Sequence, residues 1–80
     1  MITIKCFGPI QEAFGRKELT VKAATVREAM ERAAVLGLDP KLFRAALLFV
    51  NDRPLRGARR FAFKLKDGDV LALLSPVGGG

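Results

Sequence analysis

The spacing of apolar and polar residues changes along the chain, and each spacing predicts a different element. Over residues 2–7 and again over residues 18–23, apolar and polar side chains alternate, which is typical of strands with one buried face. A Gly15-Arg16-Lys17 turn precedes the second run, and residues 11–14 form a short connection or a single helical turn. We therefore expect the first two strands to form a hairpin.

From residue 25 onward the apolar spacing becomes helical. Thr25 and Glu28 match a capping box, in which the Thr side chain caps the first turn and the Glu side chain reaches back. One face of the predicted helix carries Val26, Ala29, Met30, Ala33 and either Leu36 or Gly37. Gly37 is well placed to end the helix in a left-handed conformation, with Leu38 folding back on the last turn.

The second half of the chain predicts a short helix and more strands. Asp39 and Pro40 are typical of the N-cap and first position of a helix, which we expect to reach about residue 45. Two continuous apolar runs, residues 46–50 and 70–74, suit strands that are buried on both faces. Residues 61–65 suit a short strand, and turns are expected at residues 51–54 and 66–69. The order predicts an α+β fold, with one main helix, a short second helix and a mixed sheet of about five strands. The first and last strands are the natural central pair.

Composition narrows the possible functions. The 80 residues suit one domain, and a formal net charge of +6 follows from 14 Lys and Arg against 8 Asp and Glu. The chain has no His, which removes the commonest general base and metal ligand, so we expect no metal site and no active site of its own. Its single cysteine, Cys6, excludes an internal disulfide, and we expect it in the core. Without a recognisable signal peptide or a long apolar run, we expect a soluble, cytoplasmic protein.

The last residues suggest a reactive end. We expect residues 1–76 to form the folded domain and residues 77–80, Val-Gly-Gly-Gly, to form a flexible reactive tail that Pro76 directs away from it. A terminal carboxyl has a pKa of about 3.5, so at neutral pH it is a poor electrophile that must be activated, for example as an acyl adenylate made with ATP. Glycine lacks a Cβ and passes through a narrow channel into an activating enzyme. The alternative is a frayed end or a remnant of cloning.

Three stretches resemble the MoaD/ThiS family of sulfur carriers. Residues 66–80, KDGDVLALLSPVGGG, are similar to the family's closing pattern DGDxVxxxPPVxGG. Residues 7–15, FGPIQEAFG, resemble its FFAxxRExxG, and Thr25-Val26-Arg27-Glu28-Ala29 resembles the opening of its helix. The resemblance covers nearly the whole chain and implies a ubiquitin-like (β-grasp) fold. The length favours the MoaD branch, the small subunit of molybdopterin synthase.

The resemblance also implies a function. Gly80 would be adenylated by a ubiquitin-activating-type enzyme that consumes ATP and would then become a thiocarboxylate, and Gly79 matches the other glycine of the motif. The sulfur would pass to a pterin precursor in the large subunit of molybdopterin synthase, for molybdenum cofactor biosynthesis. The chain would thus be a non-catalytic subunit and cosubstrate without a tightly bound cofactor.

A partner-binding strip is expected beside the reactive end. Its residues would be Leu73, Leu74, Pro76, Val77 and Gly78. Leu74 matches an aromatic position of the family near the partner interface, whereas Gly78 stands where the family varies. The sequence departs from the pattern at Ser75, in place of a proline, at Gln11, in place of an arginine, and in a longer loop over residues 56–60. The charge of +6 is also unusual for such carriers.

Alternatives remain open for the function and for one segment. One alternative is a carrier for thiamine synthesis, tRNA thiolation, cysteine synthesis or protein conjugation, and another is a basic β-grasp module that binds RNA. Between residues 53 and 66 lie Arg53, Arg56, Arg59, Arg60, Lys64 and Lys66 without an acidic residue. They suit an acidic partner, RNA phosphates or a plain solvated loop. We expect Phe61 and Phe63 in the core rather than stacked on bases, and neither membrane nor nucleic acid as a partner.

Overall fold

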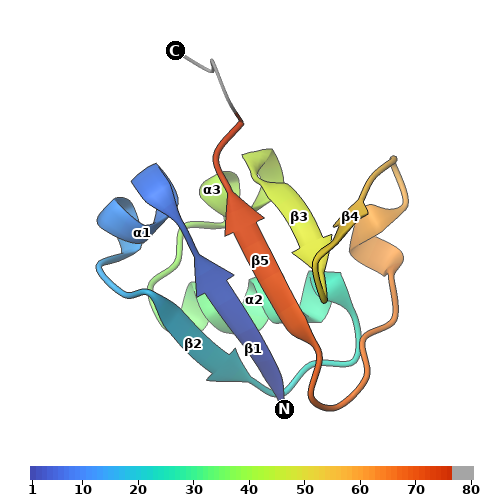
Figure 1. Cartoon of the computed structure of the whole chain (residues 1–80). Coiled ribbons are helices and arrows are strands. Elements are labelled where there is room, and N and C mark those ends of the chain that lie inside the picture. Colours follow the sequence, from blue (N-terminus) through green and yellow to red (C-terminus); the bar gives the residue numbers. More distant parts are fainter. Residues whose placement is uncertain (77–80) are drawn as a thin grey trace.

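The computed structural model describes residues 1–76, and Figure 1 shows one layer of strands with helices packed behind it. The elements follow the chain in this order: β1 (Ile2–Cys6), α1 (Gly8–Phe14), β2 (Glu18–Val21), α2 (Val26–Val35), α3 (Pro40–Ala45), β3 (Leu47–Val50), β4 (Arg53–Leu55), the 3-10 helix η1 (Arg60–Ala62) and β5 (Val70–Leu74). The expected α+β class is confirmed.

The sheet is mixed, and its centre joins the two ends of the described chain. Its strand order is β2-β1-β5-β3-β4. β1 and β5 run parallel, with Ile4 opposite Leu71, and the other neighbours are antiparallel. The predicted hairpin of the first two strands and the predicted pairing of the first and last strands are both confirmed (Figure 1). This topology, with α2 crossing one face, is the β-grasp arrangement.

The main helix begins and ends as its sequence predicts. The Thr25 hydroxyl accepts a hydrogen bond from the Glu28 amide at 3.2 Å, and the Glu28 carboxylate accepts one from the Ala24 amide at 2.9 Å. The capping box therefore forms, although its return bond reaches the residue before the cap. Gly37 has a φ of 106°, and the amide of buried Leu38 donates to the Ala33 carbonyl at 3.0 Å. Only glycine takes up this left-handed conformation without strain.

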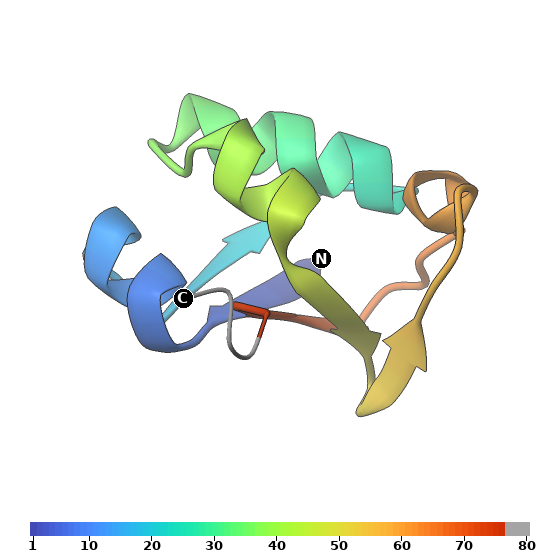
Figure 2. The ribbon, with the colours of Figure 1, turned by 90° about the horizontal axis from the view of Figure 1, so that it is seen from above.

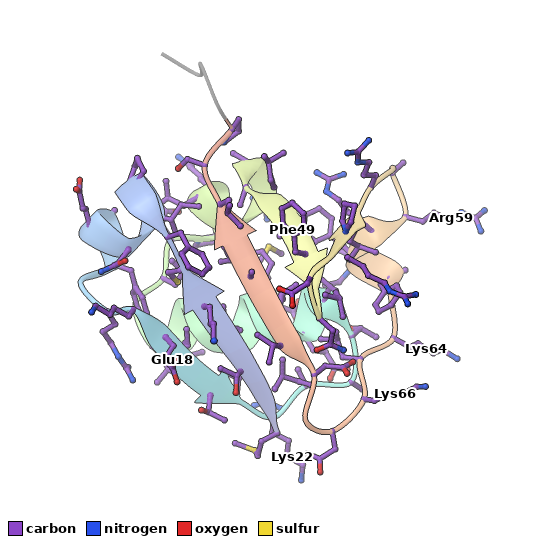
Figure 3. The ribbon with its side chains drawn as sticks, in the orientation of Figure 1. Glu18, Lys22, Phe49, Arg59, Lys64 and Lys66 are labelled. Atoms are coloured by element: carbon purple, nitrogen blue, oxygen red, sulfur yellow. The ribbon has the colours of Figure 1, made fainter. Side chains whose placement is uncertain are left out.

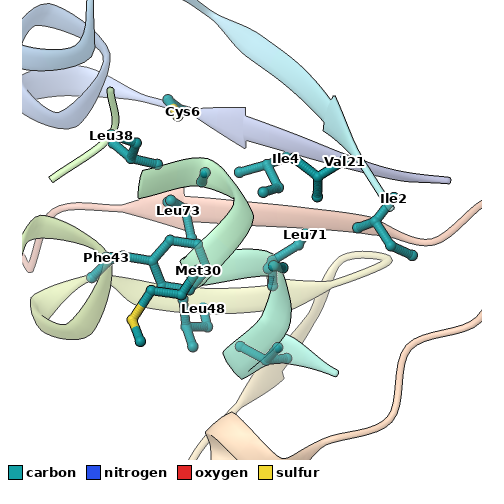
Figure 4. Close-up of a cluster of buried hydrophobic side chains, with 14 of the residues drawn as sticks. Ile2, Ile4, Cys6, Val21, Met30, Leu38, Phe43, Leu48, Leu71 and Leu73 are labelled. Carbon is teal, nitrogen blue, oxygen red and sulfur yellow. The ribbon is translucent and has the colours of Figure 1, made fainter. Parts of the chain in front are cut away.

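The core lies between one face of the sheet and the helices. Figure 2 shows α2 and α3 on the same side of the sheet, and Figure 4 shows the cluster of side chains that they cover. Alternate strand residues point into it, and the largest fully buried side chains are Phe43, Ile2, Ile4, Leu38, Leu71, Leu73, Val26 and Cys6. Cys6 thus occupies the core position that was expected.

Four details differ from the sequence predictions. α1 already begins at Gly8, since Pro9 fits a first helical turn, where its missing N–H is not needed. β4 lies partly in the predicted 51–54 turn. Residues 61–65 form no strand: η1 leads to a single bridge between Lys64 and Thr25. Finally, β3 and β5 are buried on one face only, because no helix of the described chain covers the outer face of the sheet (Figure 2).

Candidate functional site

The candidate site is the end of β5, where the chain leaves the folded body. β5 ends at Leu74, and Ser75 is half-buried while Pro76 is exposed. The predicted tail residues Val77, Gly78, Gly79 and Gly80 lie outside the described residues. The site is therefore built from the residues that hold and surround the end of β5.

Neighbouring strands hold β5 on both sides up to its last residue. On one side, the Phe7 amide donates a hydrogen bond of 3.2 Å to the Leu73 carbonyl. On the other side, Leu74 pairs in register with Leu47, the first residue of β3. Because both neighbours reach this point, the position and direction in which the chain leaves the sheet are fixed by backbone hydrogen bonds.

Apolar side chains surround this point on the outer face of the sheet. Phe7 and Leu47 are each 45% exposed, although they are large and apolar, and Phe49, Ala72 and Leu74 are half-buried. Register places Ala72 beside Phe49 and Leu74 beside Leu47, and Phe7 follows Cys6, which lies opposite Leu73 on the other side of β5. We call the five surface residues the exit patch: Phe7, Leu47, Phe49, Ala72 and Leu74. Figure 3 shows Phe49 on the outer face, in front of the sheet. Contiguous exposed apolar surface of this kind is typical of protein–protein contacts.

The predicted partner-binding residues differ in how far they are buried. Leu73 is fully buried in the core, so its side chain is not available to a partner, whereas Leu74 and Pro76 lie at the surface. The reason is the two-residue period of a strand, which turns Leu71 and Leu73 inward and Leu74 outward. Sequence reasoning missed Phe7, Leu47 and Phe49. The same period, applied to β1 and β3, points to all three.

Two other candidate centres among the described residues are a metal site and the Cys6 thiol. Among residues 1–76, no three His, Cys, Asp or Glu side chains gather closely enough to hold a metal ion. Burial raises the pKa of the Cys6 thiol, which keeps it protonated and unsuited to relaying sulfur as a thiolate. The five residues of the exit patch are all apolar, so they contain no group for acid–base catalysis.

The two phenylalanines of the basic segment, residues 53–66, have different surroundings. Phe61 packs against the core beneath the Arg60 guanidinium, which lies 4.6 Å from the ring centroid. Phe63 is 40% exposed, so the expectation of core packing holds for Phe61 and is wrong for Phe63. No helix within residues 1–76 has the length and hydropathy needed to cross a membrane.

Comparisons with known proteins agree with this architecture. The crystal structure of the Amycolatopsis orientalis BexX/CysO complex contains a chain with a TM-score of 0.81 and 27% identity, with 100% of both chains covered. A complex of subunits 1 and 2 of the molybdopterin-converting factor from Helicobacter pylori 26695 gives 0.68 and 28%, covering 99% of this chain and 97% of the other. Small archaeal modifier protein 1 from Methanosarcina acetivorans gives 0.73 and 21%, covering 99% and 95%, and shows the fold alone.

The family comparison covers almost the whole sequence. No curated protein matches the chain. The ThiS family matches residues 4–80, which include the predicted reactive glycines as well as all five residues of the exit patch. With this match and a ubiquitin-like β-grasp fold, the chain belongs to the ThiS family of ubiquitin-like sulfur carriers.

Proposed function

We propose that this protein is the small, sulfur-carrying subunit of a molybdopterin synthase. The observation that carries the proposal is the exit patch: an apolar surface surrounds the fixed end of β5, immediately before the glycines that the family match includes. A carrier needs this combination, because its partner must hold the body while the last residues enter a catalytic pocket.

The proposed chemistry takes place at the Gly80 carboxyl group. A carboxylate oxygen attacks the α-phosphorus of ATP on an adenylating enzyme, which forms an acyl adenylate and releases pyrophosphate. A sulfur nucleophile at the oxidation level of sulfide then displaces AMP and leaves a thiocarboxylate. In the synthase, that sulfur displaces an oxygen leaving group from a carbon of the pterin precursor and forms a thioester, and hydrolysis of the thioester leaves a thiol on the pterin and returns the Gly80 carboxylate. Gly79 and Gly78 add no side chains that would obstruct the pocket.

The exit patch would supply the binding energy for this cycle. Ordering the four tail residues costs roughly 1–2 kcal/mol each. Burial of apolar surface contributes about 25 cal/mol per Å². Large side chains such as Phe7 and Leu47 therefore offset a substantial part of the cost when a partner covers them. Since the patch and tail adjoin, the adenylating enzyme and the large synthase subunit would bind in turn and not together.

Two similarities support the choice of partner and also define the second candidate. The Helicobacter pylori structure at 28% identity is a complex of molybdopterin-converting factor subunits 1 and 2, which favours a large synthase subunit as partner. The Amycolatopsis orientalis structure at 27% identity is a BexX/CysO complex. It favours, as the second candidate, a carrier that gives its sulfur to another route, such as thiamine, cysteine or thiolated tRNA synthesis.

Intact mass spectrometry tests the proposed chemistry. The chain is incubated with ATP, sulfide and the cognate adenylating enzyme, and loading appears as a mass gain equal to the difference between sulfur and oxygen. Deletion of Gly80 is expected to abolish that gain and leave the thermal unfolding midpoint unchanged. Val35→Ala, at an 84% exposed site at the end of α2, is the control and is expected to load. Sulfur loading of the truncated chain would refute the proposal.

Affinity capture separates the two candidate routes. The loaded protein is used as bait, and its partners are identified by mass spectrometry. Capture of a large molybdopterin synthase subunit supports the proposed route. Capture of a sulfur-accepting enzyme of another route, with no synthase subunit, assigns the protein to the second candidate.

A further inference from the structure

The basic segment lines a groove between the β3–β4 hairpin and residues 63–66. The hollow has a volume of about 630 Å³ and is lined by Val50, Asn51, Arg53, Pro54, Leu55, Phe63, Lys64, Lys66 and Asp69. We call it the basic groove. It lies beside the start of β5, and four residue steps of about 3.3 Å separate this start from Leu74. Pro54 in the lining lies opposite Phe49 in the sheet register, so the groove adjoins the exit patch there, whereas Leu47 and Leu74 lie outside the lining.

Backbone hydrogen bonds fix one wall of the groove to the main helix. The Val26 amide donates to the Phe63 carbonyl at 3.1 Å, and the Leu65 amide donates to the Ala24 carbonyl at 2.8 Å. Leu65 is buried in the core, which anchors residues 63–65 to the body of the protein. The exposed side chains of Phe63 and Lys64 therefore project from a fixed backbone.

The other wall is the β3–β4 hairpin, which is fixed to the start of β5. The Asn51 amide donates to the Val70 carbonyl at 2.9 Å, and the Val70 amide donates to the Asn51 side-chain oxygen at the same distance. Both walls therefore hold their position without a ligand, and a ligand need not order them. Such preorganisation lowers the entropic cost of binding.

The charge of the groove is positive and largely uncompensated. Arg53, Lys64 and Lys66 are exposed, and none of them has a carboxylate within ion-pair distance in residues 1–76. The one carboxylate in the lining, Asp69, accepts hydrogen bonds from the Lys66 amide and the Asn51 side chain. Figure 3 shows Lys64, Lys66 and Arg59 on the same side of the molecule.

The inner surface of the groove is apolar. Pro54 is exposed, Leu55 is half-buried and the Phe63 ring is 40% exposed. The basic residues Arg53, Lys64 and Lys66 belong to the same lining. An extended peptide presents side chains alternately to two sides, so it can place apolar groups on this surface and carboxylates near the cations. Single-stranded RNA needs successive aromatic platforms, and the groove offers a single phenylalanine.

We infer that the basic groove binds an extended, acidic peptide segment of a partner protein, in which carboxylates alternate with apolar residues. This interaction is independent of the proposed function, because it needs neither Gly80 nor sulfur. It adds a second contact, through which a partner holds the body of the carrier while the exit patch and tail are engaged elsewhere.

The binding test uses the full chain and a defined probe. The probe is a fluorescein-labelled decapeptide in which glutamate alternates with valine or proline, and the comparison ligands are its glutamine analogue and decauridylate. Fluorescence anisotropy gives the affinities at low and physiological salt, and amide shifts of the isotope-labelled chain locate the site. We expect binding that weakens with salt, is lost with the glutamine analogue, and shifts the amides of Arg53 and residues 63–66.

Charge reversal provides the matched variants. Lys64→Glu with Lys66→Glu is expected to lower the affinity for the glutamate peptide by about tenfold, since two attractive contacts become repulsive. Lys17→Glu with Lys22→Glu, near the opposite edge of the sheet, makes the same change in net charge and is expected to alter the affinity less than about twofold. Circular dichroism confirms that both variants fold.

Several outcomes would overturn the inference. These are absence of peptide binding, amide shifts centred outside the groove, an equal loss of affinity in both variants, or tighter binding of decauridylate than of the peptide. Deletion of Gly80 is expected to leave peptide binding unchanged. Failure here is thus distinguishable from failure of sulfur loading, which is measured by mass.

Discussion

At the residue scale, Asp69 shows how one side chain fixes a junction. Its carboxylate accepts a 2.8 Å hydrogen bond from the Lys66 amide and a 2.9 Å bond from the Asn51 side chain. These bonds, the Lys66 amide first, lower the pKa of Asp69 below its usual value because they stabilise the charged form. The residue thereby joins the 66–69 turn to the β3–β4 hairpin and sets the entry of the chain into β5.

Stability is expected to depend on pH through Asp69. Its pKa is lower in the folded than in the unfolded chain, so its contribution is complete above the unfolded value of about 3.9 and is lost as pH falls through the folded value. Asp69→Asn is expected to lower the free energy of unfolding at neutral pH by about 1–2 kcal/mol, since a charged acceptor is lost. Urea unfolding between pH 3 and pH 7 measures this.

Asp52→Asn serves as the control for that measurement. Asp52 is exposed in the β3–β4 turn with a φ of 70°, a conformation that Asn also tolerates. We expect the free energy of unfolding of this variant to equal that of the unsubstituted chain at each pH. If Asp69→Asn retains the full loss of stability between pH 5 and pH 3, another carboxylate is responsible.

At the scale of elements, the start of α2 links the main helix to the basic groove. Thr25 caps the helix and also forms a β-bridge with Lys64, in the wall of the groove. The backbone part of this link does not depend on the Thr side chain, but the helix cap does. Loss of the cap therefore destabilises α2 directly and the wall of the groove only indirectly, through α2.

Replacement of the cap residue is expected to destabilise the protein moderately. Thr25→Ala removes the acceptor for the Glu28 amide and is expected to cost about 1 kcal/mol of unfolding free energy. Thr25→Ser keeps the hydroxyl and is expected to restore most of it. Chemical denaturation measures both variants, and equal stability of Ala and Ser at this position would contradict a capping role.

Most elements could be predicted from local patterns, and the misses share a cause. α2 and the strands at the sheet centre have strong periodicity and clear caps. β4 was missed because Arg53 and Pro54 are typical of a turn; a proline is tolerated here because β4 is an edge strand with an unpaired side. The strand expected over residues 61–65 does not form, since burial of Leu65 and contact of Phe61 with the core fix a 3-10 turn. Tertiary contacts, which sequence spacing does not contain, decide both cases.

At the scale of the molecule, the site could be predicted only in part. Leu74 follows from the pattern at the end of the sequence, whereas Phe7, just after β1, and Leu47, in β3, are distant in sequence and flank β5 only through the sheet pairing. Leu73 was expected at the surface but is buried, because the helices cover the face of β5 to which it points. The exit patch is thus a property of topology, and its position beside the tail follows from β5 lying between β1 and β3.

A charge in the exit patch is expected to disrupt partner binding selectively. Leu47→Glu changes a side chain that is 45% exposed, so the free energy of unfolding should fall by less than about 1 kcal/mol. Affinity for the large synthase subunit, measured by titration calorimetry, should fall at least about tenfold. Val35→Glu, at an 84% exposed apolar site at the end of α2, is the control and should bind normally. Equal binding by both variants would exclude the patch as the interface.

The parallel pairing of β1 with β5 has a consequence for synthesis of the protein. Translation produces β1 first, yet its central neighbour arrives only with Val70–Leu74, and so the sheet cannot close until nearly the whole chain exists. Any product that stops before residue 70 lacks the middle of the sheet and remains open to proteolysis. The exit patch is therefore present only in copies whose sheet has closed, so a partner that binds the patch also selects folded copies.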